Sequence, residues 1–178
     1  QLRIRRGATS ASIFGHGAKL LHLRHGCADL AALRVAHAWF GAGNFRTDAM
    51  DVQYTQTVLH WHGRSNPRRP AYELPLGGPV PFEQWEAKLH DRPQRPIPRL
   101  SSELVISEAQ GGFDLRYRTH GGLPGVATQI ALDFAPGGIW ETDDCAVQPQ
   151  AGQVVFLKRG WGTTAVQDNP GMVSRPAS

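Results

Sequence analysis

The stretch LVISEAQGGFDLRYRTHGGLPGVATQIALDFAPGG, residues Leu104 to Gly138, decides the fold of this chain. A mostly apolar residue stands at every second position along it, with charged or polar residues between. This period of two places alternate side chains on opposite faces of a β-strand, whereas a helix repeats every 3.6 residues. The alternating positions are Val105 and Ser107, then Phe113, Leu115 and Tyr117, then Val126, Thr128, Ile130, Leu132 and Phe134. We therefore expect three successive strands in an antiparallel meander, with one apolar face that another layer covers.

A hairpin turn is predicted at Ala109-Gln110-Gly111-Gly112, between the first two of these runs. Tight hairpin loops need backbone conformations with positive φ, which glycine adopts without steric cost. We expect this turn to make the runs before and after it antiparallel neighbours.

Alternating runs elsewhere in the chain predict further short strands. The predicted strands are Leu2 to Arg5, Thr9 to Phe14, Lys19 to Arg24, Asn44 to Arg46, Asp51 to Thr55, Thr57 to His62, Gln153 to Lys158 and Thr163 to Gln167. Of these, the run QVVFLK at Gln153 to Lys158 has the composition of a buried strand.

The segment from Cys27 to Gly43 fits two structures. Its alanines and its apolar spacing are compatible with an amphipathic helix. Against this, Leu33, Val35 and His37 continue a two-residue alternation, and glycines end the segment without a helix cap. We expect a strand over about residues 31–40.

These patterns place the chain in the all-β class. Many glycines and prolines are typical of proteins built from short strands and turns. We expect one antiparallel β-sandwich domain of the supersandwich-like kind over residues 1–167, followed by an irregular tail at 168–178. Eight of the thirteen prolines lie in residues 63–98, which we interpret as a long connection with at most one short helix, near Phe82 to His90.

Positive charge is concentrated near the beginning of the chain. Five cations precede the first carboxylate, Asp29, namely Arg3, Arg5, Arg6, Lys19 and Arg24. Most cations of the chain are arginine, whose planar guanidinium binds carboxylate, sulfate or phosphate groups. A basic N-terminal face is compatible with an acidic polysaccharide or a nucleic acid. Of these we expect the polysaccharide, and we expect neither a nucleic-acid nor a membrane partner.

The two cysteines, Cys27 and Cys145, lie far apart in the sequence. They could pair in an oxidising compartment, but no CxxC or zinc-binding spacing accompanies them. We expect two free, buried thiols. No apolar run approaches the roughly 20 residues that a membrane-spanning helix needs.

The triplet His60-Trp61-His62 is the strongest candidate for metal chemistry. On a strand, two histidines separated by one residue point the same way, as in metal sites of cupin-like barrels. The remaining ligands of a cupin motif are missing, because the first following glutamate is Glu73. We expect no metal and no cofactor, and keep as an alternative a metal-dependent cupin-like enzyme that uses His60 and His62.

Other histidines do not indicate a catalytic site. His22, His25 and His37 could act as general bases, but no carboxylate partner is evident in the sequence, and we expect them on strand faces. Exposed tryptophan rings can stack on sugar rings. The candidate ligand-binding residues are Trp61, His60, His62, Arg116 and Arg118, and no catalytic residue is predicted.

Several phrases of the chain resemble the C-terminal β-sandwich region of heparinase II/III-like bacterial proteins, which are related to polysaccharide lyases. The phrases are Ser10 to Gly15, Leu23 to Gly26, Trp39 to Phe45 and Pro124 to Gly138.

This resemblance implies a β-sandwich that follows an α/α-toroid in a longer, periplasmic or secreted protein. The catalytic Tyr and His of such lyases lie largely in the toroid, so no catalytic residue is transferred to this chain. The resemblance implies a non-catalytic domain that supports or extends an acidic-glycan site, next to a missing N-terminal helical domain. A structural or protein-interaction module is the alternative.

Overall fold

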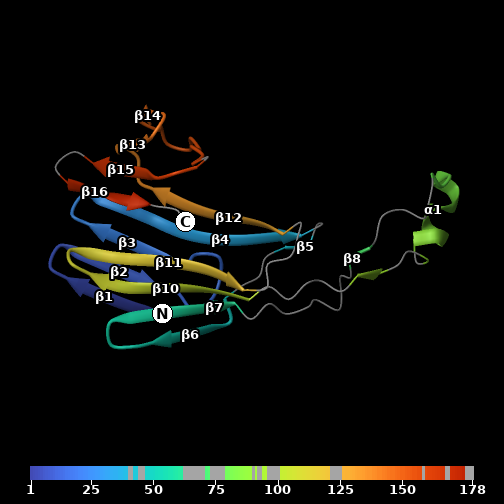
Figure 1. The fold of residues 1–178 in the computed structure, drawn as a ribbon, viewed down its shortest axis with the longest axis horizontal. Coiled ribbons are helices and arrows are strands. Elements are labelled where there is room, and N and C mark those ends of the chain that lie inside the picture. The colour runs from blue at the N-terminus through green and yellow to red at the C-terminus, as the bar shows by residue number, and fades with distance from the viewer. Residues whose placement is uncertain are drawn as a thin grey trace.

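The chain folds as an antiparallel β-sandwich with one short helix, as the sequence predicts. The computed structural model describes residues 1–39, 42–43, 47–61, 71–72, 79–89, 91, 94–95, 101–120, 126–157, 159–166 and 169–174. Figure 1 shows two sheets stacked as layers, with a smaller sheet beside β12 and the helix beyond the end of the sandwich.

The large sheet has the strand order β1-β2-β3-β4-β12, and β5 adds to β4. Its strands are β1 Leu2–Arg6, β2 Thr9–Ile13, β3 Leu21–His25, β4 Ala28–Trp39, β5 Ala42–Gly43 and β12 Ala127–Phe134. The segment that was ambiguous between helix and strand is therefore the strand β4, which begins three residues before the expected position.

The facing sheet has the order β11-β10-β7-β6. Its strands are β6 Ala49–Val52, β7 Gln56–Trp61, β10 Ser101–Ala109 and β11 Gly112–His120. The predicted hairpin joins β10 to β11, with Ala109 opposite Gly112 and Gly111 at a φ of 77°. The turn prediction is confirmed.

A small C-terminal sheet has the order β14-β13-β15-β16. Its strands are β13 Ile139–Thr142, β14 Ala146–Val147, β15 Gly162–Val166 and β16 Asn169–Ser174. The expected irregular tail is thus wrong for residues 169–174. Pro170 fits this strand because β16 has a neighbour on one side only in the described part of the chain, and a missing N–H is tolerated at a strand edge.

The Pro-rich connection is described in part. It contains β8 Ala71–Tyr72, β9 Gln94–Arg95 and the helix α1 Phe82–Leu89, so the single short helix is confirmed. Residues 63–70, 73–78, 90, 92–93 and 96–98 lie outside the described residues.

The core forms where the inner faces of the two large sheets meet. Buried side chains of the large sheet and of the facing sheet make one cluster: Ala11, Ile13, Leu20, Leu21, Leu23, Leu30, Leu33, Leu59, Trp61, Leu104 and Ile106. Each fully buried Leu or Ile stabilises the fold by about 1.5–3 kcal/mol. This contact defines the sandwich.

Two predictions about the deciding stretch are wrong. First, β12 does not continue a meander with β11, because it crosses to the large sheet and pairs with β4, Leu132 opposite Leu33. Second, Leu104 and Ile106 face the core, not Val105 and Ser107. The register explains this phase, since Leu104 lies opposite Tyr117 on the next strand and shares its face.

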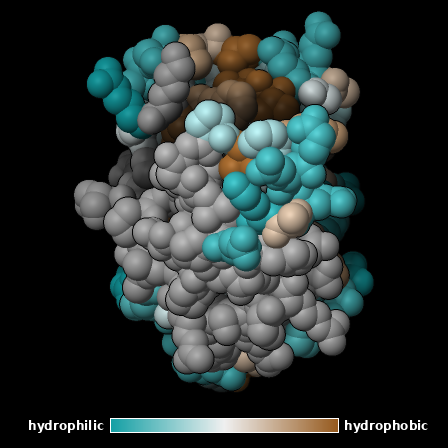
Figure 2. Space-filling view, turned by 90° about the vertical axis from the view of Figure 1, so that its right-hand side faces the viewer, coloured by the Kyte–Doolittle hydropathy of each residue, from teal (hydrophilic) through white to brown (hydrophobic). Residues whose placement is uncertain are grey.

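Two further predictions about burial are also wrong. Residues 153–157 form no strand, and Val154 and Phe156 are 71% and 75% exposed. Both cysteines are free, as expected, but exposed and not buried. Figure 2 shows hydrophobic surface at the top of the molecule, at the height of the small C-terminal sheet in Figure 1.

Candidate functional site

The outer face of the large sheet carries three exposed arginines, Arg3 and Arg5 on β1 and Arg24 on β3. Arg5 lies opposite Ser10 of β2, and Ser10 lies opposite Arg24, so these residues form a row across three strands. Neighbouring strands are 4.7–4.9 Å apart, which places Arg5 and Arg24 about 10 Å apart at the backbone. Arg3 shares the face because it is two residues from Arg5. We call Arg3, Arg5 and Arg24 the basic face.

The carboxylates of this side of the sheet are already engaged. Asp29 of β4 accepts a hydrogen bond from His22, with 2.9 Å between Oδ1 and Nε2. Asp133 of β12 forms an ion pair with Arg34. No carboxylate among the described residues forms an ion pair with Arg3, Arg5 or Arg24. The basic face therefore has an excess of positive charge in contact with solvent.

Three of the predicted ligand-binding residues come together on the outer face of the facing sheet. Arg118 of β11 and His60 of β7 flank Glu103 of β10 in one row. Arg116, two residues before Arg118, lies on the same face.

Charge on this second face is balanced by local pairing. Arg118 Nη1 lies 3.6 Å from Glu103 Oε1, and His60 Nε2 lies 3.1 Å from Asp51 Oδ2. Exposed pairs of this kind contribute little to stability, but they reduce the net charge that a ligand meets.

The other two predicted ligand residues do not join this face. Trp61 is 1% exposed, and its ring packs edge-on against Tyr117 with 6.0 Å between the ring centroids. This burial gives Trp61 a packing role and removes it from the candidates for stacking on a sugar. His62 lies outside the described residues.

A polar cluster around the buried His37 joins the two layers of the sandwich. His37 of β4 is 1% exposed, and its Nε2 lies 2.7 Å from the Tyr117 hydroxyl oxygen of β11. The other imidazole nitrogen, Nδ1, lies 2.9 Å from Oγ1 of Thr128 on β12. The Tyr117 hydroxyl donates to Ser102 Oγ of β10 at 3.0 Å. We call His37, Ser102, Tyr117 and Thr128 the polar cluster.

Burial shifts both titratable members of the polar cluster away from their charged forms. Desolvation lowers the pKa of His37 below 6.5. Desolvation also raises the pKa of Tyr117 above 10.0, while the hydrogen bond to Ser102 acts in the opposite direction. The cluster is neutral near pH 7, and because His37 is enclosed we interpret it as a structural connection between the sheets. The sequence contained its signal, since His37 continues the inward phase of Leu33 and Val35.

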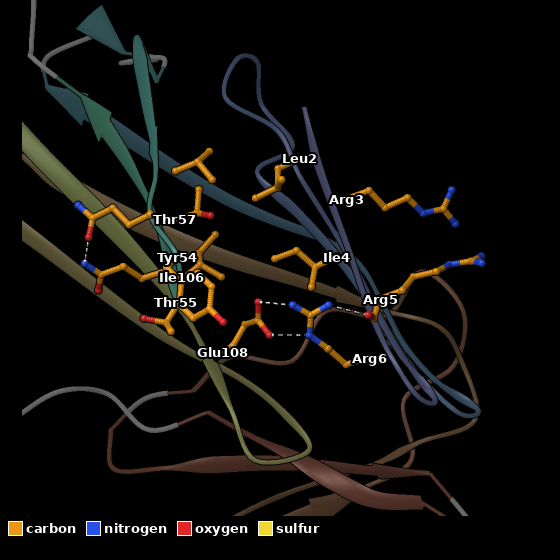
Figure 3. Close-up of a pocket in the computed structure, with 13 residues that line it drawn as sticks. Leu2, Arg3, Ile4, Arg5, Arg6, Tyr54, Thr55, Thr57, Ile106 and Glu108 are labelled. Carbon is orange, nitrogen blue, oxygen red and sulfur yellow. Dashed lines mark hydrogen bonds and ion pairs between the residues drawn. The ribbon is translucent and has the colours of Figure 1, made fainter.

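A groove of about 250 Å³ lies at one open side of the sandwich, between β1 and the chain from Val52 to Thr57. Figure 3 shows Leu2 and Ile4 pointing into it, while the side chains of Arg3 and Arg5 point away. Nothing in the sequence indicates this groove, because its two walls are far apart in the chain.

The described residues contain no group of three His, Cys, Asp or Glu side chains placed to hold a metal ion. Within the same residues, no helix has the length and apolar character to cross a bilayer. Comparison of the chain with models of protein families, with curated proteins and with solved structures finds no match. The resemblance to heparinase II/III-like proteins therefore stays a prediction.

Proposed function

We propose that this chain is a non-catalytic β-sandwich domain of a larger carbohydrate-active protein related to polysaccharide lyases, and that it supports an acidic-glycan site. The observation that carries the proposal is the basic face, where the three arginines of β1 and β3 form no ion pair with a carboxylate among the described residues. Guanidinium groups bind carboxylate and sulfate with paired, charge-assisted hydrogen bonds. A sheet holds such groups at fixed spacing, which suits a repeating polyanion.

The basic face is favoured over the face with Arg116 and Arg118, because Arg118 is paired with Glu103 and other carboxylates lie nearby. A glycan bound there would displace an existing ion pair. We therefore use the face that carries the predicted ligand residues Arg116, Arg118 and His60 as the control for glycan binding to the basic face.

We expect removal of the basic face to weaken binding of a heparin-derived oligosaccharide. A hydrogen bond to a charged group contributes about 1.5–3 kcal/mol, so Arg5→Ala and Arg24→Ala should each raise the Kd about tenfold or more. The matched double variant Arg116→Ala/Arg118→Ala should leave the Kd nearly unchanged. Isothermal titration calorimetry at two salt concentrations measures both effects, and added salt should weaken binding to the unaltered chain.

Two results would contradict this assignment. Absence of binding to any uronate or sulfated oligosaccharide would exclude the glycan proposal. If only Arg116→Ala/Arg118→Ala lost binding, the glycan site would be assigned to the facing sheet.

A protein-interaction module is the second candidate, favoured by the exposed apolar side chains between residues 139 and 157. Ile139, Val154 and Phe156 are each more than half exposed. Contiguous apolar side chains on a surface are typical of a region that another protein covers. If the chain associates through them, Val154→Ser/Phe156→Ser should lower its apparent mass in sedimentation velocity at high concentration. An unchanged mass that is already monomeric would remove self-association through this surface.

A further inference from the structure

The groove beside β1 has apolar side chains on both walls, next to the polar side chains of residues 53–57. Leu2 and Ile4 of β1 are partly buried against the core, and they point into the groove (Figure 3). Val52, which ends β6 on the opposite wall, is 54% exposed. Ile106 of β10 lies at the base. An occupant of this groove would bury apolar surface that water now covers in part.

Among the residues that the structure describes, the backbone of β1 is paired on one side only, because β1 is the outermost strand of the large sheet. The direction of its backbone groups follows from β2. On β2 and its flanks, Ala8 O accepts from Gly26 N at 3.2 Å, and Phe14 N donates to Leu20 O at 2.9 Å, both toward β3. Because the direction alternates along an antiparallel strand, the groups of Thr9, Ala11 and Ile13 point toward β1.

The residues opposite these three positions are Arg6, Ile4 and Leu2, so their backbone groups bond to β2. The backbone groups of Arg3 and Arg5 consequently point to the open edge, along the groove. The side chain of Arg6 confirms this direction, since its Nη1 donates to Arg5 O at 3.1 Å. Arg3 N–H, Arg3 C=O and Arg5 N–H have no partner among the described residues.

We propose that the open edge of β1 binds an extended peptide segment by strand addition, and that the segment alternates acidic and apolar side chains. The peptide backbone would pair with Arg3 N–H, Arg3 C=O and Arg5 N–H. Its apolar side chains would enter the groove against Ile4 and Val52. Main-chain hydrogen bonds with pockets for alternate side chains are the general basis of this kind of recognition.

The positive charge of Arg3 and Arg5 favours a peptide with acidic side chains. Arg3 and Arg5 project from the outer face of β1, directly beside the outward positions of any added strand. Glutamate or aspartate there forms favourable cross-strand pairs, whereas lysine or arginine is repelled. A second copy of this chain paired through β1 would place arginines beside arginines. Charged residues on edge strands commonly prevent such self-pairing. The arginines of β1 therefore disfavour a second copy of the chain but permit an acidic strand to bind.

The test compares Arg3→Pro with Arg3→Ala. Both variants remove the guanidinium, but only proline also removes the N–H that the peptide needs. Proline is tolerated at an edge position whose N–H faces outward, so the sandwich should stay folded, as circular dichroism can check. The probe is a short, end-capped synthetic peptide in which Glu and Val alternate, titrated into the unaltered chain and each variant.

We expect Arg3→Ala to raise the Kd of this peptide about threefold, by loss of one exposed charge pair. Arg3→Pro should raise it about fivefold more, by loss of one backbone hydrogen bond. In the unaltered chain, the peptide should slow amide hydrogen exchange at Arg3 and Arg5, and leave that of Ile4, which already bonds to β2, unchanged. A peptide in which Lys replaces Glu should bind more weakly.

Equal Kd values for Arg3→Pro and Arg3→Ala, or no change in amide exchange at Arg3 and Arg5, would overturn the proposal. So would β1-mediated dimerisation of the chain that Arg3→Pro abolishes, since the occupant would then be a second copy. The heparin-derived oligosaccharide separates this result from the proposed function. It contacts side chains and not the strand edge, so the two Arg3 variants should bind it equally, and Arg24→Ala should affect it more than the peptide.

Discussion

Replacing Trp61 by alanine is expected to lower the free energy of unfolding by about 3–5 kcal/mol. This is the range for removing a large aromatic side chain from a packed core, where a cavity remains. Trp61 is 1% exposed and contacts Tyr117 edge to face, a geometry that contributes about 0.5–1.5 kcal/mol beyond burial. Urea unfolding followed by circular dichroism measures the loss.

Trp161 provides the matched control for this substitution. It is 37% exposed, so Trp161→Ala should lower the free energy of unfolding by about 1 kcal/mol or less. Trp61→Phe keeps an aromatic ring in the core and should recover part of the stability. If Trp61→Ala proved no more destabilising than Trp161→Ala but weakened glycan binding, Trp61 would be a ligand residue, as the sequence alone suggested.

The folded chain is expected to lose stability as the pH falls below about 6.5, because of His37. Burial lowers the pKa of His37, so below its ordinary value of 6.5 the unfolded chain binds more protons at this residue than the folded chain. The free energy of unfolding therefore decreases with falling pH, at a slope of up to about 1.4 kcal/mol per pH unit for one proton. The loss stops once the pH is below the pKa of the folded state.

Tyr117 is expected to lower the stability of the folded chain at high pH. Its pKa is raised by burial, so above pH 10.0 the unfolded chain releases the phenol proton first and the folded state again loses stability.

Urea unfolding from pH 5 to pH 8 tests the loss of stability that we expect from His37. His37→Gln should flatten this profile, and His16→Gln, at an exposed position, should not. A profile that keeps its slope in His37→Gln would assign the titration to another group.

Local features of the fold were predictable from the sequence. The hairpin between β10 and β11 follows from two strands with clear alternation and a glycine at the position that needs positive φ. The choice of strand over helix for β4 follows from the alternation of Leu33, Val35 and His37. These signals depend on residues close together in the chain.

Features that depend on distant partners were not predictable. Alternation predicts that β12 is half-buried, but it does not say whether β11 or β4 lies beside it. It also predicts Ile130 on the covered face, whereas Ile130 is 52% exposed. In the run Leu104-Val105-Ile106 all three side chains are apolar, so the pattern does not identify the inward pair. Val154 and Phe156 have the composition of a buried strand, but burial requires a second layer, and the described residues supply none over them.

The candidate site also has one part that was predictable from the sequence and other parts that were not. The concentration of arginine before Asp29 predicted a basic face, and the pairing of β1, β2 and β3 brings Arg3, Arg5 and Arg24 together. The groove beside β1 was missed because it is formed by strands from two sheets. The polar cluster was missed because its four members come from four different strands.

The polar cluster also limits how the two sheets can align. Leu and Ile side chains attract one another with little regard to position, so sliding one sheet by two residues would still bring apolar groups into contact. The same slide would separate Nε2 of His37 from the Tyr117 hydroxyl, while Thr128, on the same sheet as His37, would stay in place. An enclosed polar atom that loses its partner costs about 1–3 kcal/mol. Apolar contacts thus hold the two sheets together. His37 favours the observed alignment of the sheets over alignments that are shifted by two residues.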